Sequence, residues 1–168
     1  MYKLFVDGGG QTIKNRVFPT YFSCKAFLGS AEIKGVSLNR WYLKSLIPHK
    51  YSKTRKVIGE GGEILYLTPD SNIIIPRRCS ILDLKGKETN NISEYAALYY
   101  GLLRFVNEVG IKDIQVYTDS QLIVNQVLRI WPSKKHLKPW CDAVQDLKWK
   151  GVILSWIPRE QILEVLGH

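Results

Sequence analysis

The first half of the chain alternates short apolar runs with turn residues, a pattern typical of β-strands. Residues 2–7 are apolar-rich and end in Asp-Gly-Gly-Gly, which predicts a strand that leads into a turn. Residues 20–28 are rich in aromatic side chains and predict a second strand, and residues 63–67 and 72–75 are further candidates. Consecutive strands of this kind favour an antiparallel meander.

From residue 92 onward the apolar positions change to helical spacing. They recur every three or four residues from Ile92 to Val106, and Gly110 ends the predicted helix. Further along we expect helices at about 120–129 and 137–148, strands at 113–118 and 151–157, and a short closing helix. The alternation of strands and helices favours parallel strands joined by right-handed crossovers. The fold class is therefore α/β, with one mixed sheet flanked by helices.

Length and composition are consistent with this picture. A chain of 168 residues favours a single domain over residues 1–168, and 45% hydrophobic with 23% charged residues excludes a disordered or collagen-like chain. No run of about 18 apolar residues predicts a membrane span, and we expect no membrane partner. Three widely spaced cysteines, Cys24, Cys79 and Cys141, favour a reduced, cytoplasmic protein without structural zinc.

The charge is strongly basic. Twenty-four Lys and Arg against 15 Asp and Glu give a net charge of +9, which favours a polyanionic partner such as nucleic acid over a basic surface kept for solubility. Between residues 33 and 59 there are seven basic residues and no acid, with aromatic residues interleaved. We predict a basic insert at about residues 29–86, which either contacts phosphates and stacks on bases or is a solvated extension.

Three carboxylates stand at the ends of predicted elements. Asp7 ends the first strand, Glu94 lies in the first turn of the long helix, and Asp119 ends the strand at 113–118. Taken singly, each is more simply a turn or helix-capping residue, with Glu94 placed three residues after Asn91. If the sheet brings them together, they repel one another unless cations lie between them, and such oxygen-rich clusters suit Mg²⁺ or Mn²⁺.

Four segments, in the right order, resemble motifs of the ribonuclease H family. Residues 89–98 (TNNISEYAAL) are similar to its T-N-N-x-x-E-x-x-A-L signature, and residues 117–127 (YTDSQLIVNQV) to its D-S-Q-L-V-x-N-Q segment. Residues 5–9 (FVDGG) resemble its first-strand motif, and residues 156–161 (WIPREQ) the stretch before its last helix. The resemblance implies the ribonuclease H-like fold with a mixed five-stranded sheet.

The resemblance also implies an endonuclease that cuts the RNA strand of an RNA–DNA hybrid. Asp7, Glu94 and Asp119 would hold two Mg²⁺ or Mn²⁺ ions, and the products would carry 5′-phosphate and 3′-hydroxyl ends. We expect a monomer that needs no small-molecule cofactor. The residues expected to contact nucleic acid are Asn90, Asn91, Gln121, and the basic pair Lys134 and Lys135. The basic pair is alternatively an ordinary solvated start of a helix.

The chain departs from the family pattern near its end. The family's fourth acid follows the R-E-x-N stretch in an Ala-Asp pair, but here Ile162 replaces the Asn and Val-Leu occupies positions 165–166. Glu164 is the candidate for a fourth catalytic acid if the last helix is shifted, and Glu160 is a more distant one. Without such an acid, three carboxylates would bind metal more weakly.

Other functions remain open on the sequence alone. Residues 6–12 (VDGGGQT) also resemble the phosphate loop of sugar kinases and actin, but that architecture needs two such domains. A binding module for hybrids without catalysis fits the missing fourth acid. Junction resolvases and transposases share the acids, although the T-N-N-x-x-E and D-S-Q motifs point away from them.

Overall fold

The computed structural model describes six stretches of the chain with their side chains and several short elements by their backbone alone. The former are residues 2–9, 21–33, 91–105, 113–133, 137–147 and 149–167; the latter are residues 12–13, 16–17, 38–42, 55–58, 64–67, 90 and 106–108. All statements below concern these residues.

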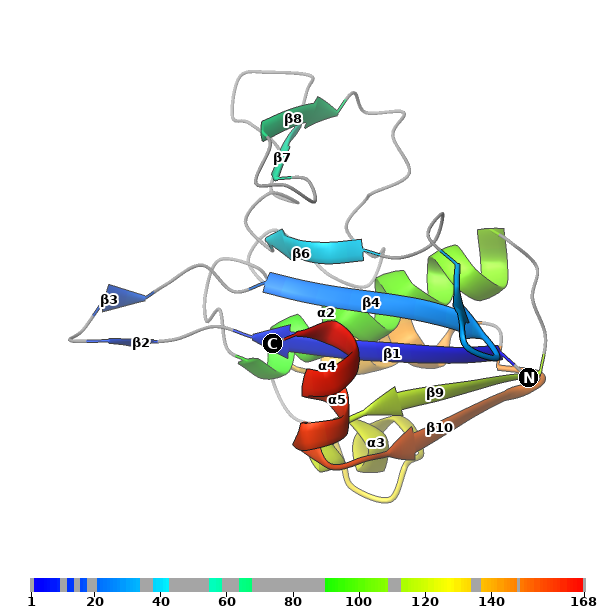
Figure 1. Cartoon of the computed structure of the whole chain (residues 1–168). Coiled ribbons are helices and arrows are strands. Elements are labelled where there is room, and N and C mark those ends of the chain that lie inside the picture. Colours follow the sequence, from blue (N-terminus) through cyan, green and yellow to red (C-terminus); the bar gives the residue numbers. More distant parts are fainter. Residues whose placement is uncertain are drawn as a thin grey trace.

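A mixed sheet forms the centre of the molecule (Figure 1). Its middle strand β1 (Tyr2–Gly9) pairs antiparallel with β4 (Tyr21–Leu28) and parallel with β9 (Ile114–Thr118), which pairs parallel with β10 (Val152–Trp156). The short strands β5 (Ala31–Glu32) and β6 (Leu38–Tyr42) both pair antiparallel with β4. The combination of an antiparallel meander with parallel strands confirms the predicted fold class.

The helices cover both faces of this sheet. They are α2 (Asn90–Leu102), which continues as the π-helix η3 (Leu103–Glu108), followed by α3 (Gln121–Val127), α4 (Lys138–Gln145) and α5 (Arg159–Leu166). Helices α2 and α4 lie behind the sheet in Figure 1, and α5 lies in front of it. Each predicted helix is present, with ends within a few residues of those expected from the apolar spacing.

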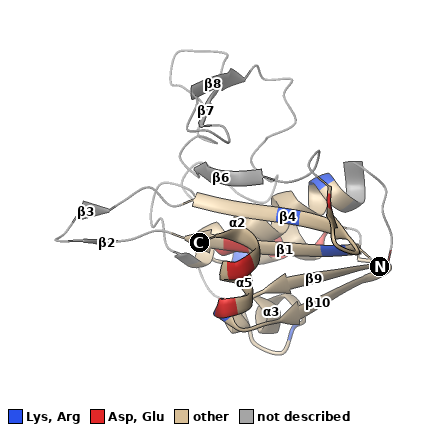
Figure 2. Cartoon of the chain, in the orientation of Figure 1, with Lys and Arg blue, Asp and Glu red and all other residues tan. Residues whose placement is uncertain are grey.

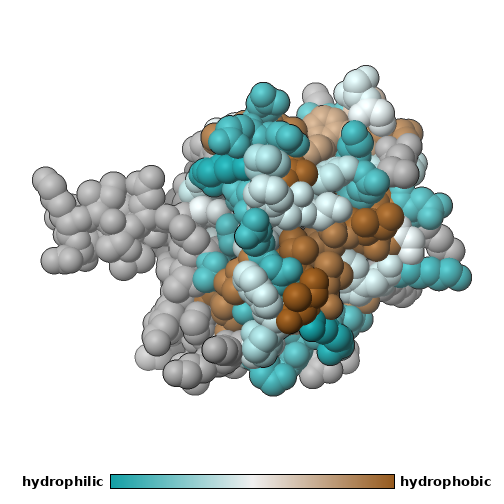
Figure 3. Space-filling view, turned by 90° about the horizontal axis from the view of Figure 1, so that it is seen from below, coloured by the Kyte–Doolittle hydropathy of each residue, from teal (hydrophilic) through white to brown (hydrophobic). Residues whose placement is uncertain are grey.

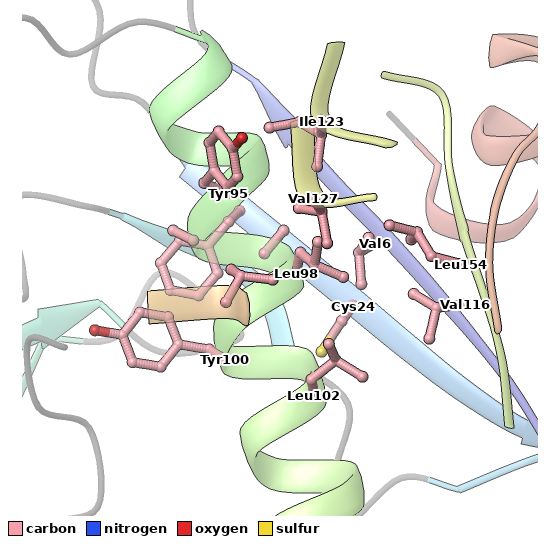
Figure 4. Packing of buried hydrophobic residues seen from close by; sticks show 14 of the residues in the cluster. Val6, Cys24, Tyr95, Leu98, Tyr100, Leu102, Val116, Ile123, Val127 and Leu154 are labelled. Carbon is pink, nitrogen blue, oxygen red and sulfur yellow. The ribbon is translucent and has the colours of Figure 1, made fainter. Parts of the chain in front are cut away.

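The core lies between the sheet and α2. Alternate residues of β1 and β4, among them Leu4, Val6 and Cys24, point to α2 and are at most 1% exposed. Gly101 of α2 allows a close approach, because a Cβ there would lie 3.2 Å from Val6 Cγ1. Figure 4 shows this packing, in which each large side chain contributes about 1.5–3 kcal/mol of burial free energy.

The opposite face of the sheet is covered less completely. Helix α5 buries Ile162 and Leu166 there, but Leu163 is 42% exposed and Ile153 of β10 is 57% exposed. Figure 3, which views the molecule from the side of β10, also shows hydrophobic residues at the surface. Helix α5 therefore covers only part of this face of the sheet. The first turn of α5 lies near the end of β9, where Arg159 contacts Asp119.

The segment between β5 and α2 contains strands that the sequence predicted only in part. Residues 63–67 do contain a strand, β8 (Ile64–Leu67), but it pairs with β7 (Arg55–Ile58) in a separate two-stranded sheet. Instead β6, which pairs antiparallel with β4, is the third strand of the meander. It lies within the residues predicted as the basic insert, and it was not predicted because Asn39 and Arg40 interrupt its apolar pattern. That residues 29–86 are an insert stays a prediction, and the strand expected at 72–75 lies outside the described residues.

Other short segments add little to the core. Strands β2 (Thr12–Ile13) and β3 (Arg16–Val17) pair with each other. Cys24 and Cys141 are buried and do not form a disulfide with each other, and Cys79 lies outside the described residues. Among the described helices, none combines the length and the apolar character that a bilayer crossing demands. The cytoplasmic location and the monomeric state stay predictions.

Candidate metal centre

Three carboxylates meet at one end of the sheet. Asp7 lies near the end of β1, Asp119 directly follows β9, and Glu94 is the fifth residue of α2, just past its first turn. One carboxylate oxygen from each lies within 4.8 Å of the others. Because β1 and β9 are parallel neighbours, their carboxyl ends share one edge, and Figure 2 shows acidic residues at this end of the sheet. The expected convergence of the three acids is confirmed.

A glycine makes the close approach of Glu94 possible. A Cβ at Gly8 would lie 2.3 Å from the carbonyl carbon of Ser93 and 2.4 Å from the backbone nitrogen of Glu94. Real Cβ atoms do not approach backbone so closely, so the end of β1 and the start of α2 touch only because residue 8 has no side chain. The Gly in the Asp-Gly-Gly motif is thus part of the site.

Burial and mutual repulsion disfavour the charged forms of these acids. Asp7 is 1% exposed, and burial, together with the charges of Asp119 and Glu94, raises its pKa to about 8. Burial and the charge of Asp119 raise the pKa of Glu94 to about 7, although a hydrogen bond with Ser120 acts in the opposite direction. Without a cation, a large fraction of these two groups is protonated at neutral pH.

Asp119 is held by two side chains, one from the last residue of β10 and one from the first residue of α5. Arg159 Nη1 donates a hydrogen bond to Asp119 Oδ2 at 3.1 Å, and Trp156 Nε1 donates one to the Asp119 backbone oxygen at 3.0 Å. The helix-capping role is taken by the next residue, since Ser120 Oγ accepts from Ile123 N at 3.3 Å. The capping role that was the simpler alternative for Asp119 taken singly therefore belongs to Ser120.

These residues fit a divalent cation. Asp119 Oδ1 is buried and receives no hydrogen bond from any residue that the structure describes. A buried carboxylate oxygen without a donor is costly, and a metal ion satisfies it. Three carboxylates offer the hard oxygen ligands that Mg²⁺ and Mn²⁺ prefer.

The other predicted site residues lie outside the acid group or have side chains that the structure does not describe. Glu164 is exposed on α5, as is Glu160, and neither belongs to the acid group. Asn91 is half-buried at the start of α2, and Gln121 is the exposed first residue of α3, next to the acids in sequence. The side chains of Asn90, Lys134 and Lys135 lie outside the described residues. The roles predicted for all of these residues stay predictions.

Sequence reasoning did not identify the two side chains that hold Asp119. Trp156 and Arg159 both stand in the WIPREQ segment, which was noted only as a match to a motif. The signal was present, because Pro158 ends the strand and places the next residue at the start of a helix beside the strand ends. Only the pairing of β10 with β9 shows that this helix start faces Asp119.

Comparison with known proteins agrees with the fold. The structure is similar to the N-terminal RNase H domain of Rv2228c from Mycobacterium tuberculosis, which was solved as a fusion with maltose binding protein. The match has a TM-score of 0.53 and 20% sequence identity, and it covers 98% of this chain and 95% of that chain. The structure is also similar to RNase H1 from the halophilic archaeon Halobacterium salinarum NRC-1, with 15% identity, coverage of 98% and 92% of the two chains and a TM-score of 0.52.

A third similar structure is LC11-RNase H1, isolated from compost by a metagenomic approach, at 19% identity, coverage of 97% and 88% of the two chains and a TM-score of 0.52. At these identities the likeness concerns the fold alone. No curated protein matches the chain. In sequence, residues 77–165, more than half of the chain, match the model of the family described as reverse transcriptase-like. The chain therefore belongs to this ribonuclease H-like family, as its motifs and its fold both indicate.

Proposed function

We propose that this protein hydrolyses the RNA strand of RNA–DNA hybrids with the help of two divalent metal ions, Mg²⁺ or Mn²⁺. The observation that carries the proposal is the convergence of Asp7, Glu94 and Asp119 within 4.8 Å in a chain of this family. A structural role does not account for it, because three acids this close together, one buried and two partly buried, repel one another and lower stability unless a cation neutralises them.

In this proposal the three acids hold the ions, and the remaining residues prepare them. When bound, the ions activate a water molecule and stabilise the leaving 3′ oxygen, which yields 5′-phosphate and 3′-hydroxyl ends. Gly8 keeps the end of β1 against the start of α2, and Arg159 occupies one oxygen of Asp119 and leaves the other for a metal ion. Gln121 lies two residues after Asp119 and Asn91 three residues before Glu94, and both are candidates for contact with the strand that carries the 2′-hydroxyl groups.

A hybrid-binding module without catalysis is the second candidate. The position of Glu164, exposed and outside the acid group, favours it, because three carboxylates hold two cations less firmly than four. The raised pKa values of Asp7 and Glu94 act in the same direction, since protons compete with metal ions for these groups.

The test is a cleavage assay on a hybrid with an end-labelled RNA strand, with Mg²⁺ or Mn²⁺ at pH 8. We expect cleavage of the hybrid, none of the corresponding DNA duplex, and none by Asp119→Asn in the same preparation. Products with 5′-phosphate ends, detected by their degradation with a 5′-phosphate-dependent exonuclease, support the proposed chemistry. Tight binding of the hybrid by the parental protein without cleavage under either metal would select the binding module.

A further inference from the structure

Arg159 forms an ion pair whose two halves differ sharply in burial. Its guanidinium Nη1 lies 3.1 Å from Asp119 Oδ2, and the side chains are 61% and 7% exposed, respectively. The cation therefore lies at the rim of the acid group, between the buried carboxylate and solvent. Because the guanidinium is exposed and solvent screens its attraction to Asp119, the pair adds little to stability, and stability alone is a weak reason for it.

The backbone around Arg159 is attached to the same strand end. Trp156 Nε1 binds the backbone oxygen of Asp119 at 3.0 Å, and Ile157 N donates to Thr118 O at 2.9 Å. Pro158, in extended conformation, then starts α5. These contacts fix the origin of the arginine side chain relative to Asp119, so the guanidinium is held over the acids by more than its own hydrogen bond.

Most of the guanidinium remains available. Arginine has five N–H donors in a planar fork, and within the described part of the chain Asp119 Oδ2 is their sole hydrogen-bond acceptor. A planar fork can bind a carboxylate along one edge and a phosphate along another, whereas a lysine ammonium presents its three donors from a single point. A phosphate cut by ions among these acids must lie beside Asp119, on the open side where Arg159 is exposed.

We propose that Arg159 bridges the site and its substrate, with one nitrogen orienting Asp119 and the others binding a phosphate oxygen of the nucleic-acid strand at the acids. The inference rests on the proposed function for the identity of this ligand. It gives the last helix a role in the site even though Glu164 does not join the acid group: α5 contributes a cation for the substrate rather than a ligand for the metal.

The test compares Arg159→Gln, Arg159→Lys and the matched control Lys150→Gln, which removes one exposed positive charge before the opposite end of β10. Two quantities are measured on the full chain: hybrid affinity in a chelator, by fluorescence anisotropy at fixed salt, and Mg²⁺ affinity of the protein alone, by calorimetry. Arg159→Gln should weaken hybrid binding about tenfold, the size expected for a lost hydrogen bond to a charged group. Arg159→Lys should lose part of this, and Lys150→Gln less than twofold.

Mg²⁺ affinity distinguishes the bridge from a purely orienting role. Because removing a cation beside Asp119 lowers the repulsion of a metal ion, Arg159→Gln should bind Mg²⁺ at least as tightly as the parental protein. The bridge is overturned if Arg159→Gln binds the hybrid as Lys150→Gln does. It is also overturned if Mg²⁺ affinity alone falls, since Arg159 would then only orient Asp119. Hybrid binding that depends on Arg159 in a chain that cleaves nothing would leave the bridge standing and reject the hydrolase.

Discussion

Strand β9 carries an aspartate at each end, and the two have opposite surroundings. Asp113 precedes the strand, is exposed, and lines a shallow cavity of about 230 Å³ with Gly151 and the first residues of β9 and β10. Asp119 follows the strand, is nearly buried, and meets two further acids and an arginine. The same residue type on the same strand is thus a turn residue at one end and part of a candidate metal centre at the other.

The difference shows what turns an acid into a site. Parallel β1 and β9 bring their carboxyl ends together, and α2 begins against that edge, so that three elements each deliver one carboxylate. At the other edge Asp113 belongs to no such group of three possible metal ligands among the described residues. Convergence and burial, rather than residue type, make the chemistry, and the following predictions test the contrast between the two ends.

The largest effect is expected from the aspartates themselves. Asp119→Asn should lower hybrid cleavage at least about 100-fold, because the change removes a charge that the ions need, whereas Asp113→Asn should stay within about twofold. Initial rates at saturating Mg²⁺ measure both. Equal losses in the two variants would mean that the acid group is not where cleavage occurs.

The next largest difference is expected between substitutions of Gly8, at the acid end of the sheet, and of Gly151, at the opposite end. Gly8→Ala places a Cβ 2.3 Å from backbone of α2, so it should lower the free energy of unfolding by about 3 kcal/mol and reduce cleavage strongly. Gly151→Ala meets its nearest atom at 3.0 Å but has a φ of 79°, so it should cost about 1–2 kcal/mol and leave cleavage intact. Urea denaturation and the hybrid assay measure both quantities. A Gly8→Ala protein as stable and active as the parent contradicts the tight contact.

The pH dependence of stability should also originate at the acid end. In the folded state the pKa of Asp7 is about 8 and that of Glu94 about 7, above their ordinary values of 3.8 and 4.5. Protonation of these two groups therefore stabilises the folded state. This contribution is fully present below about pH 4 and is lost as the pH rises through 7–8. In a chelator, Tm should fall by at least about 5 °C between pH 5 and pH 9.

The effect of Mg²⁺ and the behaviour of two variants test the same raised pKa values. Mg²⁺ should raise Tm more at pH 8 than at pH 5, because protons compete for the same oxygens. Asp119→Asn removes a charge that raises both pKa values, so its decline with pH should be shallower, whereas Asp113→Asn should follow the parental curve. A parental Tm that rises between pH 5 and pH 9 in chelator is the opposite sign and would refute the raised pKa values.

The smallest effects concern two tryptophans that each donate one hydrogen bond. Trp156 Nε1 binds Asp119 O at 3.0 Å at the acid end, and Trp149 Nε1 binds Val144 O at 2.8 Å near the start of β10. Replacement of either by Phe should cost about 1 kcal/mol of stability. Only Trp156→Phe should also lower cleavage, by several-fold, since it loosens the backbone of Asp119. Similar activity in both variants would show that this anchor does not matter for the site.

Much of the fold could be predicted because it is encoded locally. The helical spacing from Ile92 onward, the aromatic strand at residues 20–28 and the compact strand at 113–118 each correspond to an observed element. The failure was β6, where Asn39 and Arg40 interrupt the apolar pattern. A strand that gains its stability from pairing with β4 need not carry a strong pattern of its own, because tertiary context overrides propensity.

The sequence by itself determined which acids stand at the ends of elements, and the motifs around Asp7, Glu94 and Asp119 indicated that they act together. Only the tertiary structure decided that Glu164 stays outside the group while Arg159 joins it, and that Gly8 is the point of contact between β1 and α2. The physical reason is that hydrophobic period and capping preferences act over a few residues. Distances between side chains far apart in the chain depend on strand pairing and on how closely a helix packs against a strand end.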